Sequence, residues 1–196
     1  MDQQHRTCTA FIDGAFFTSG PQPQVALEVK AAIGQGGTRQ ILVFDDGSGR
    51  VLDFDLSGSD QEIVARLHPA SAEGVKTPGR PKLGVVAREV TLLPRHWEWL
   101  ASQPGGASVS LRKLVEAARA ANGGRDRVRL AQQAADRFMM AMLGDQPGYE
   151  EASRALYAGD RDRFDAITQP WPADLRDHAK RIAGPAFMTE ASSDAA

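Results

Sequence analysis

The chain has 196 residues, of which 42% are hydrophobic and 24% are charged, and these proportions are ordinary for a globular protein with one large domain or two small ones. Its single cysteine, Cys8, excludes an intramolecular disulfide framework, and no apolar run approaches the roughly 20 residues that cross a bilayer. Residues 1–11 lack the basic and apolar segments of a signal peptide, so we expect a cytoplasmic protein with no membrane partner.

Charge is unevenly distributed along the chain, whose net charge is −2. Residues 1–78 carry 6 basic and 10 acidic side chains, residues 79–130 carry 10 and 4, and residues 131–196 carry 7 and 11. A basic block inside an acidic chain favours an anionic partner, because opposite charges speed the encounter and a polyanion releases counterions on binding.

The first 68 residues predict a small α+β unit. Asp13-Gly14 is the two-residue turn of a β-hairpin, and Ser59 is placed to cap a helix. The spacing of apolar residues gives this order of elements: strands at 9–12 and 15–18, a helix at 23–33, strands at 41–44 and 51–56, and a helix at 60–67.

The rest of the chain predicts a linker and a mainly helical half. Residues 69–84, which are rich in proline and glycine, form the linker, and residues 85–122 form a basic strand–helix–helix module with its strand at 85–93. A helical region over 123–183 and a disordered tail over 184–196 follow. The predicted helices lie at 95–103, 108–121, 128–143, 149–158, 160–167 and 173–182. The fold class is therefore α+β, a hairpin–helix–hairpin–helix unit followed by a strand and helices.

Within the basic block, Gly79-Arg80-Pro81-Lys82 resembles the AT-hook, in which an extended Arg-Pro segment lies in a narrow A·T minor groove. Narrow grooves concentrate negative potential and favour an inserted arginine. The resemblance implies groove or phosphate contacts by Arg80 and Lys82. Pro78 stands where the motif usually has another arginine, and the alternative is a rigid surface turn that leads into the next strand.

The strand–helix–helix order of residues 85–121 resembles the ribbon-helix-helix family of bacterial repressors, in which strands from two chains pair and enter the major groove. Gly106-Ala107-Ser108 matches the segment that starts that family's second helix and holds a phosphate on backbone N–H groups. Pro94 matches the proline that opens its first helix. The resemblance implies a homodimer with Arg88 against DNA, although the apolar positions after Ser108 are one place off that family's register.

Two tryptophans lie among basic residues of the block. Trp97 shares an apolar stripe with Leu100, and we expect it in the core. Trp99 lies about 200° around the helix from Trp97. An exposed Trp99 would stack on a base; the alternative is that it packs against the N-terminal domain or a second subunit. Further along, the residues expected in the core are Phe138, Met139, Met140 and Met142.

The sequence does not predict catalysis, a metal or a cofactor. The four histidines are scattered, and one cysteine is too few for a zinc site. Four carboxylates across one predicted hairpin could hold a divalent cation, but Asp46-Gly47 is also turn chemistry and outward aspartates on a strand are ordinary. These carboxylates belong to Asp45, Asp46, Asp53 and Asp55. We expect a protein that is not an enzyme, with Cys8 as a small buried hydrophobe.

Over most of its length the chain is similar to a bacterial family catalogued as domain-of-unknown-function family 2239, most clearly at residues 79–100 and 171–179. This resemblance implies one bacterial cytoplasmic unit and no particular mechanism.

These observations lead to two hypotheses. The first is a dimeric nucleic-acid-binding regulator of transcription that acts on DNA. Its expected contacts are Arg80, Lys82 and Arg88 for the groove or phosphates, and Arg95, Ser108, Arg112 and Lys113 for the backbone. The alternative is a non-enzymatic protein-interaction or adaptor module, whose basic segment docks on its own acidic flanks or on a partner protein.

Overall fold

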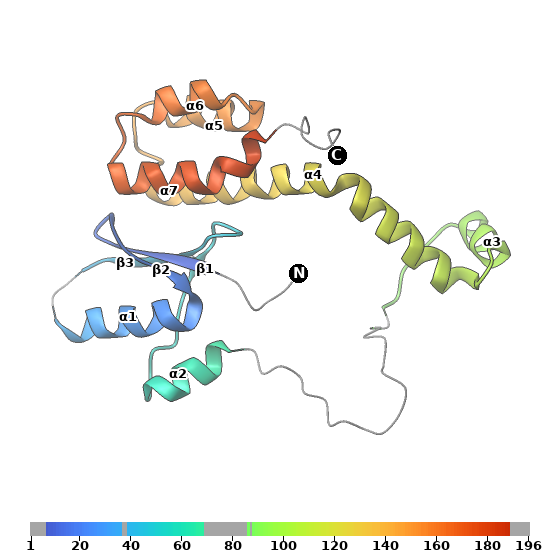
Figure 1. Ribbon diagram of the computed structural model, residues 1–196, viewed down its shortest axis with the longest axis horizontal. Helices are drawn as coiled ribbons and strands as arrows, with labels where there is room; N and C mark the ends of the chain where they lie inside the picture. The colour runs from blue at the N-terminus through green and yellow to red at the C-terminus, as the bar shows by residue number, and fades with distance from the viewer. Residues whose placement is uncertain (1–6, 37–38, 69–85, 87, 189–196) are drawn as a thin grey trace, which may run out of the picture. The chain divides into compact units, whose positions relative to one another are not determined.

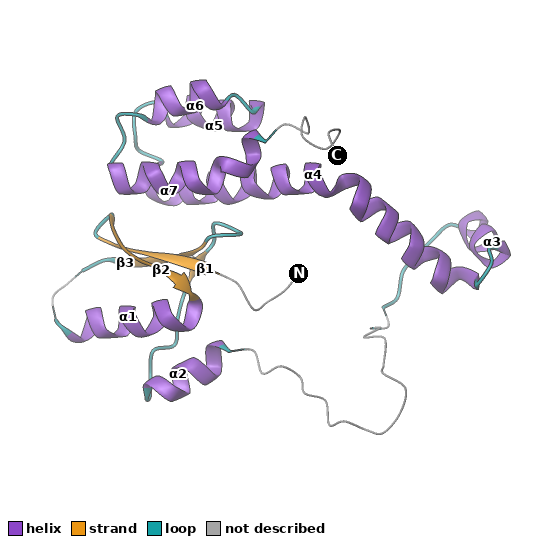
Figure 2. Cartoon of the chain, in the orientation of Figure 1, coloured by secondary structure: helices purple, strands orange, loops and turns teal. Residues whose placement is uncertain are grey.

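The computed structural model describes residues 7–36, 39–68, 86 and 88–188. The chain forms two compact units: unit 1 combines Met1–Ala70 with Arg125–Ala196, and unit 2 is Ser71–Gly124. Figure 1 labels the elements along the chain, and Figure 2 colours them by type. The predicted class, α+β with a mainly helical C-terminal half, is confirmed.

Unit 1 contains a four-stranded antiparallel sheet in the order β2-β1-β3-β4. Its strands are β1 (Thr7–Ile12), β2 (Ala15–Pro21), β3 (Ile41–Asp45) and β4 (Val51–Leu52). The predicted hairpin joins β1 to β2, since Asp13 and Gly14 have φ of 52° and 83°, the left-handed values that such a tight turn requires. Because β2 and β4 are the edges, β1 lies inside the sheet.

Helices complete both units. The N-terminal segment forms α1 (Gln22–Gly34) and α2 (Asp60–Leu67), and unit 2 contains α3 (Pro94–Ser102). The remaining helices are α4 (Gly106–Leu143), α5 (Tyr149–Ala158), α6 (Arg161–Thr168), α7 (Ala173–Ala183) and a 3-10 helix (Gly184–Phe187). The long helix α4 begins in unit 2 and ends in unit 1.

Side chains on β1 alternate between two hydrophobic layers, as the pleat of a strand requires. Cys8 packs with Val25 of α1, and Phe11 packs with Phe138 of α4, their ring centroids 5.6 Å apart. Figure 1 shows α1 on one side of the sheet and α7, with the C-terminal end of α4, on the other. The segments 1–68 and 123–183, which the sequence suggested as separate regions, therefore contribute to one core.

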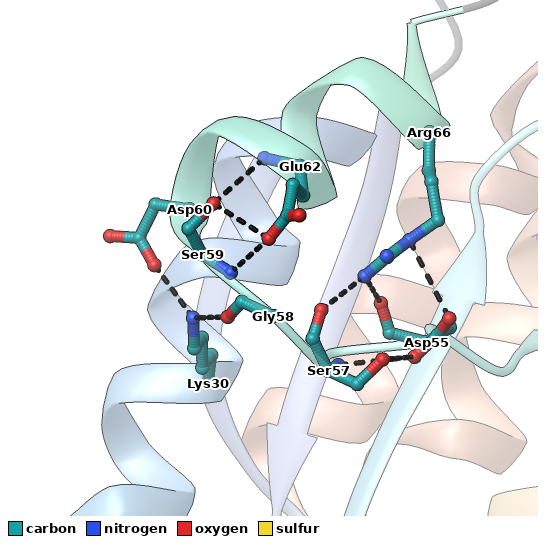
Figure 3. A network of polar contacts seen from close by, with 8 residues as sticks. All are labelled: Lys30, Asp55, Ser57, Gly58, Ser59, Asp60, Glu62 and Arg66. Carbon is teal, nitrogen blue, oxygen red and sulfur yellow. Dashed lines mark hydrogen bonds and ion pairs between the residues drawn. The ribbon is translucent and has the colours of Figure 1, made fainter.

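The sequence signal for α2 is confirmed at its first turn. The Glu62 N–H donates to the Ser59 Oγ, and the Ser59 N–H donates to the Glu62 carboxylate at 2.7 Å, which together form a capping box. Lys30 of α1 donates to the Gly58 carbonyl at 2.7 Å and to the Asp60 carboxylate at 2.8 Å (Figure 3). These contacts tie the start of α2 to α1.

The strand predicted at 51–56 is wrong beyond Leu52. Asp55 Oδ1 accepts hydrogen bonds from the N–H and Oγ of Ser57 at 3.1 and 2.6 Å. Arg66 donates to the backbone carbonyls of Asp55 and Ser57 (Figure 3). Such local bonds satisfy groups that a strand would pair with a neighbouring strand, so the ladder stops early.

The helix break predicted at Asn122-Gly123-Gly124 is also wrong, because α4 runs through it. The residues just before it are mainly alanine, the strongest helix former, and each glycine costs only about 1 kcal/mol in a helix. Asn122 Nδ2 donates to the Ala118 carbonyl at 2.9 Å and so stays compatible with the helix.

Three smaller predictions need correction. The tail expected to begin at Gly184 instead continues as the 3-10 helix, where Phe187 packs on Phe164 with ring centroids 5.4 Å apart; residues 189–196 lie outside the described residues. Met140 is 71% exposed, although Phe138 and Met139 are fully buried as expected. Trp97, expected in the core, is 40% exposed.

Candidate nucleic-acid interface

The turn between α3 and α4 fixes where the second helix of unit 2 begins. Gly105 and Gly106 have φ of 89° and 74°, left-handed values that favour glycine. A Cβ on Gly105 would lie 3.2 Å from the Cβ of Val109, so space as well as φ selects glycine there. The Gly106 N–H donates to the Gln103 carbonyl at 3.0 Å and closes the turn.

The described basic residues of the predicted interface are all exposed. Arg88 lies before α3, Arg95 lies in its first turn, and Arg112 and Lys113 lie in the second turn of α4. Ser108 is exposed in the first turn of α4. The ion pairs formed among the described residues include none of these cations. Two further predicted residues, Arg80 and Lys82, lie outside the described residues.

Helix geometry places three of these residues together. Ser108 and Arg112 are four residues apart and share one face of α4, with a rise of about 6 Å between them. Lys113 follows on the adjoining face. The first turn of α4 has no acidic residue, so the partial positive charge of its free N–H groups is not offset. An oxyanion such as a phosphate is the ligand that this set suits.

Further along α4 the positive charge is partly neutralised. Arg119 Nη1 forms an ion pair with Glu116 Oε1 at 3.1 Å, and both side chains are exposed. Exposed pairs of this kind are worth little energetically, so they compete only weakly with another anion. Arg119 therefore remains able to contact an anion, and Arg112 and Lys113 in the second turn of α4 form no ion pair with a described residue.

The predicted strand of the ribbon is not formed within the single chain. Residues 88–93 are not in a strand, and the described part of unit 2 has no other strand with which they could pair. An unpaired strand leaves its backbone groups unsatisfied, so the segment stays irregular until Pro94 starts α3. The two-stranded ribbon that the resemblance implies takes its second strand from another copy of the chain, so reading by Arg88 on such a ribbon stays a prediction.

Apolar side chains are also exposed on these two helices. Trp99 is 52% exposed on α3, and Leu114 and Val115 are 49% and 53% exposed on α4. Among the described residues of unit 2, only Leu100 and Ser110 are buried. The helices of unit 2 therefore offer apolar surface as well as charge.

The aspartates predicted as a possible cation site do not come together. Asp45 Oδ1 accepts from the N–H and Oγ of Ser48, and Asp55 is held by Ser57. Asp46 instead accepts from Thr9 Oγ1 at 2.8 Å. Within the described ranges, no group of three or more histidine, cysteine or acidic side chains could hold a metal ion.

Sequence reasoning missed a polar cluster in unit 1. Arg181 Nη2 donates to Asp46 Oδ1 and to Thr9 Oγ1, each at 3.1 Å, and lies 2.9 Å from His178 Nδ1. The only local signal is the spacing of His178 and Arg181, three residues apart on α7. Their partners lie 135 and 172 residues away from Arg181 in the chain, so no sequence pattern indicates them.

Burial sets the ionisation of two groups beside this cluster. Burial, followed by the positive charge of Arg181, lowers the pKa of His178 to about 4, and Asp46 acts in the opposite direction. Burial, followed by the charges of Asp46 and Asp45, raises the pKa of the Cys8 thiol to about 12. Cys8 is fully buried, as expected for a small hydrophobe.

The chain belongs to a bacterial family: the model described as "Uncharacterized protein conserved in bacteria (DUF2239)" matches residues 7–183, which span both units. Neither the curated proteins nor the solved structures with which the chain was compared include a match. None of the helices in the described part of the chain is long and apolar enough to cross a membrane.

Proposed function

We propose that this protein binds nucleic acid, most simply DNA, through a basic surface on the two helices of unit 2. This α3–α4 surface is defined by Arg95, Ser108, Arg112 and Lys113. One observation carries the proposal: exposed cations that form no ion pair with a described residue lie close in sequence to the N-terminus of α4, whose partial positive charge no acidic residue offsets.

The proposed contact is to the phosphate backbone. Backbone N–H groups at the start of α4 and the Ser108 hydroxyl donate to one phosphate, and Arg112 and Lys113 add charge on the following turn. Displaced counterions make such binding depend on salt: three neutralised phosphates give a slope of about −3 in log K against log salt for duplex DNA. Arg80, Lys82 and Arg88 are proposed as additional contacts to groove or phosphate.

Fluorescence anisotropy of a labelled A·T-rich duplex and a G·C-rich duplex over a salt series tests this proposal. We expect Arg112→Ala/Lys113→Ala to weaken binding to both duplexes at low salt and to reduce the salt slope by about 2. The matched control is Arg154→Ala/Arg163→Ala, which removes two exposed cations from unit 1. A loss of A·T preference in Arg80→Ala would support minor-groove binding by that residue.

Two results would contradict the proposal. The first is that neither duplex binds even at low salt. The second is that both double variants weaken binding equally, since this would mean that only the overall charge matters.

The exposed apolar side chains favour a second candidate function, a protein-interaction or adaptor module. Trp97 and Trp99 on α3 and Leu114 and Val115 on α4 are each exposed, and a partner protein or a second copy would cover such apolar side chains. A homodimer fits either function. Light scattering with size-exclusion chromatography on wild type and Leu114→Glu tests the dimer: we expect the variant to be monomeric, and a monomeric wild type would contradict it.

A further inference from the structure

A small pocket of about 240 Å³ opens between β2 and α7, within unit 1. Its lining residues are Phe16, Ser19, Asp174, Asp177, His178 and Arg181. Sites for drug-sized ligands have volumes of roughly 300–1,000 Å³, so the occupant of this pocket is smaller. The pocket is separate from the α3–α4 surface, and none of its residues belongs to the proposed nucleic-acid contacts.

One end of the pocket is acidic and aromatic. Asp174 Oδ2 accepts the backbone N–H of Phe16 at 2.8 Å, which holds the carboxylate at β2, and Asp174 forms no ion pair with a described residue. Asp177 adds a second carboxylate, which is paired with Arg176 Nε at 2.8 Å and is 65% exposed. Phe16 is 51% exposed. Carboxylates beside an aromatic face attract an ammonium group.

At the other end, one turn beyond Asp177 on the same face of α7, Arg181 carries a guanidinium that is held in place. Arg181 Nη2 contacts Asp46, Thr9 and His178, while its Nε and Nη1 have no hydrogen-bond partner among the described residues. The side chain is 52% exposed, so these remaining N–H groups are open to solvent. A guanidinium already fixed by three contacts loses little freedom when it binds a carboxylate.

His178 forms the inner wall and has an unused hydrogen-bonding atom. An arginine only donates, so His178 Nδ1 accepts from Arg181 and the proton of the neutral ring lies on Nε2. Nε2 is the one buried side-chain nitrogen or oxygen of the described residues without a hydrogen-bond partner. Its nearest carboxylate oxygen, Asp46 Oδ1, is 3.9 Å away. An unpartnered buried donor is costly.

We propose that this pocket binds a small zwitterion of the α-amino acid class, with its ammonium group at Asp174 and Asp177 and its carboxylate at Arg181. The small volume selects against larger ligands. A ligand with only an amine leaves Nε and Nη1 of Arg181 without an acceptor, and one with only a carboxylate places a negative group beside Asp174 and Asp177. A zwitterion satisfies the acidic and the basic end at once.

NMR amide-shift titration of the ¹⁵N-labelled full-length chain tests the proposal, with glycine, L-alanine, L-serine and L-proline as probes. We expect at least one of them to give saturable shifts at Phe16, Ser19 and the first turns of α7. Ethylamine and acetate, which carry one charged group each, should bind at least about tenfold more weakly than the amino acid. Equal binding of ethylamine, equal binding of acetate, or no saturable shift with any of the four amino acids overturns the proposal.

A variant series separates recognition from a general charge effect. Asp174→Asn keeps an oxygen to accept the Phe16 N–H but removes the negative charge, and we expect it to weaken amino acid binding about tenfold. Asp162→Asn, on α6 and outside the pocket lining, is the matched control and should bind as the wild type does. An equal effect of the two variants contradicts the proposal. The titration contains no nucleic acid, so its outcome is independent of the proposed function.

Discussion

At the scale of single residues, Asp46 joins parts of the chain that are far apart in sequence. Its carboxylate lies just after β3, accepts the Thr9 hydroxyl of β1, and is paired with Arg181 of α7 at 3.1 Å. The Asp46 side chain is only 11% exposed. A nearly buried carboxylate is stable there because its charge is both paired and hydrogen-bonded. The cluster therefore fixes α7 to the sheet as well as forming one end of the pocket.

His178 gives this cluster a pH dependence. In the folded chain its pKa is about 4, whereas the ordinary value is 6.5. The unfolded chain therefore binds more protons between these values, and the contribution of His178 to stability is lost as pH falls from about 6.5 to about 4. The size of the loss is of the order of 3 kcal/mol.

Urea unfolding of wild type and His178→Gln at pH 7 and pH 4.5 measures that contribution. We expect the wild type to lose more stability than the variant, which has no imidazole to protonate. The comparison also removes the effect of carboxylates whose pKa values are lowered in the fold, such as Asp55 and Glu62, because both proteins contain them. Equal losses would show that His178 does not account for the pH dependence.

At the scale of elements, sequence patterns correctly predicted the turns and helices that residues close together in the sequence stabilise. The Asp13-Gly14 turn, the Ser59 cap and the helix at Tyr149–Ala158 are confirmed. The patterns failed where contacts with distant parts of the chain, or the absence of such contacts, determine whether an element forms. A strand at 88–93 needs a partner strand that the described part of unit 2 does not supply, and β4 ends early because Arg66 fixes the following loop.

The exposure of the basic residues at the candidate interface could be predicted from the sequence, because it depends on local helical structure. Arg112 and Lys113 are exposed, as expected of charged side chains on a helix, although the apolar Leu114 and Val115 beside them are exposed too. The pocket could not be predicted, because its residues lie on β2 and α7 and come together only in the folded unit.

The turn from β3 to β4 provides an element-scale prediction. Gly49 has a φ of 66°, and a Cβ there would collide with the backbone carbonyl of Ala134 on α4. Gly49→Ala should therefore destabilise the chain by about 3 kcal/mol or more, since backbone strain and overpacking act together. Gly36→Ala is the control: its φ is 79° but its Cβ has open space, so strain alone costs about 1 kcal/mol. Chemical denaturation of both variants measures the difference, and equal losses would contradict the close contact.

At the scale of the whole molecule, unit 1 is assembled from both ends of the chain, with unit 2 between them in sequence. Its sheet comes from the N-terminal part and the helices on one face come from the C-terminal part. Because Phe11 and Phe44 share a core with Phe138, neither part buries its apolar face alone. The sheet and these helices should consequently unfold together.

Phe138→Ala tests this cooperativity. The ring is fully buried, and its centroid lies 5.6 Å from that of Phe11 and 4.9 Å from that of Phe44. Removing it should destabilise unit 1 by about 3–5 kcal/mol, because the loss of apolar burial adds to the cavity left behind. Hydrogen exchange should then show amides of β1 and α7 losing protection by the same factor, as expected of one cooperative unit. If α7 loses protection while β1 keeps it, the N-terminal and C-terminal parts of unit 1 are separate folding units and the shared core does not couple them.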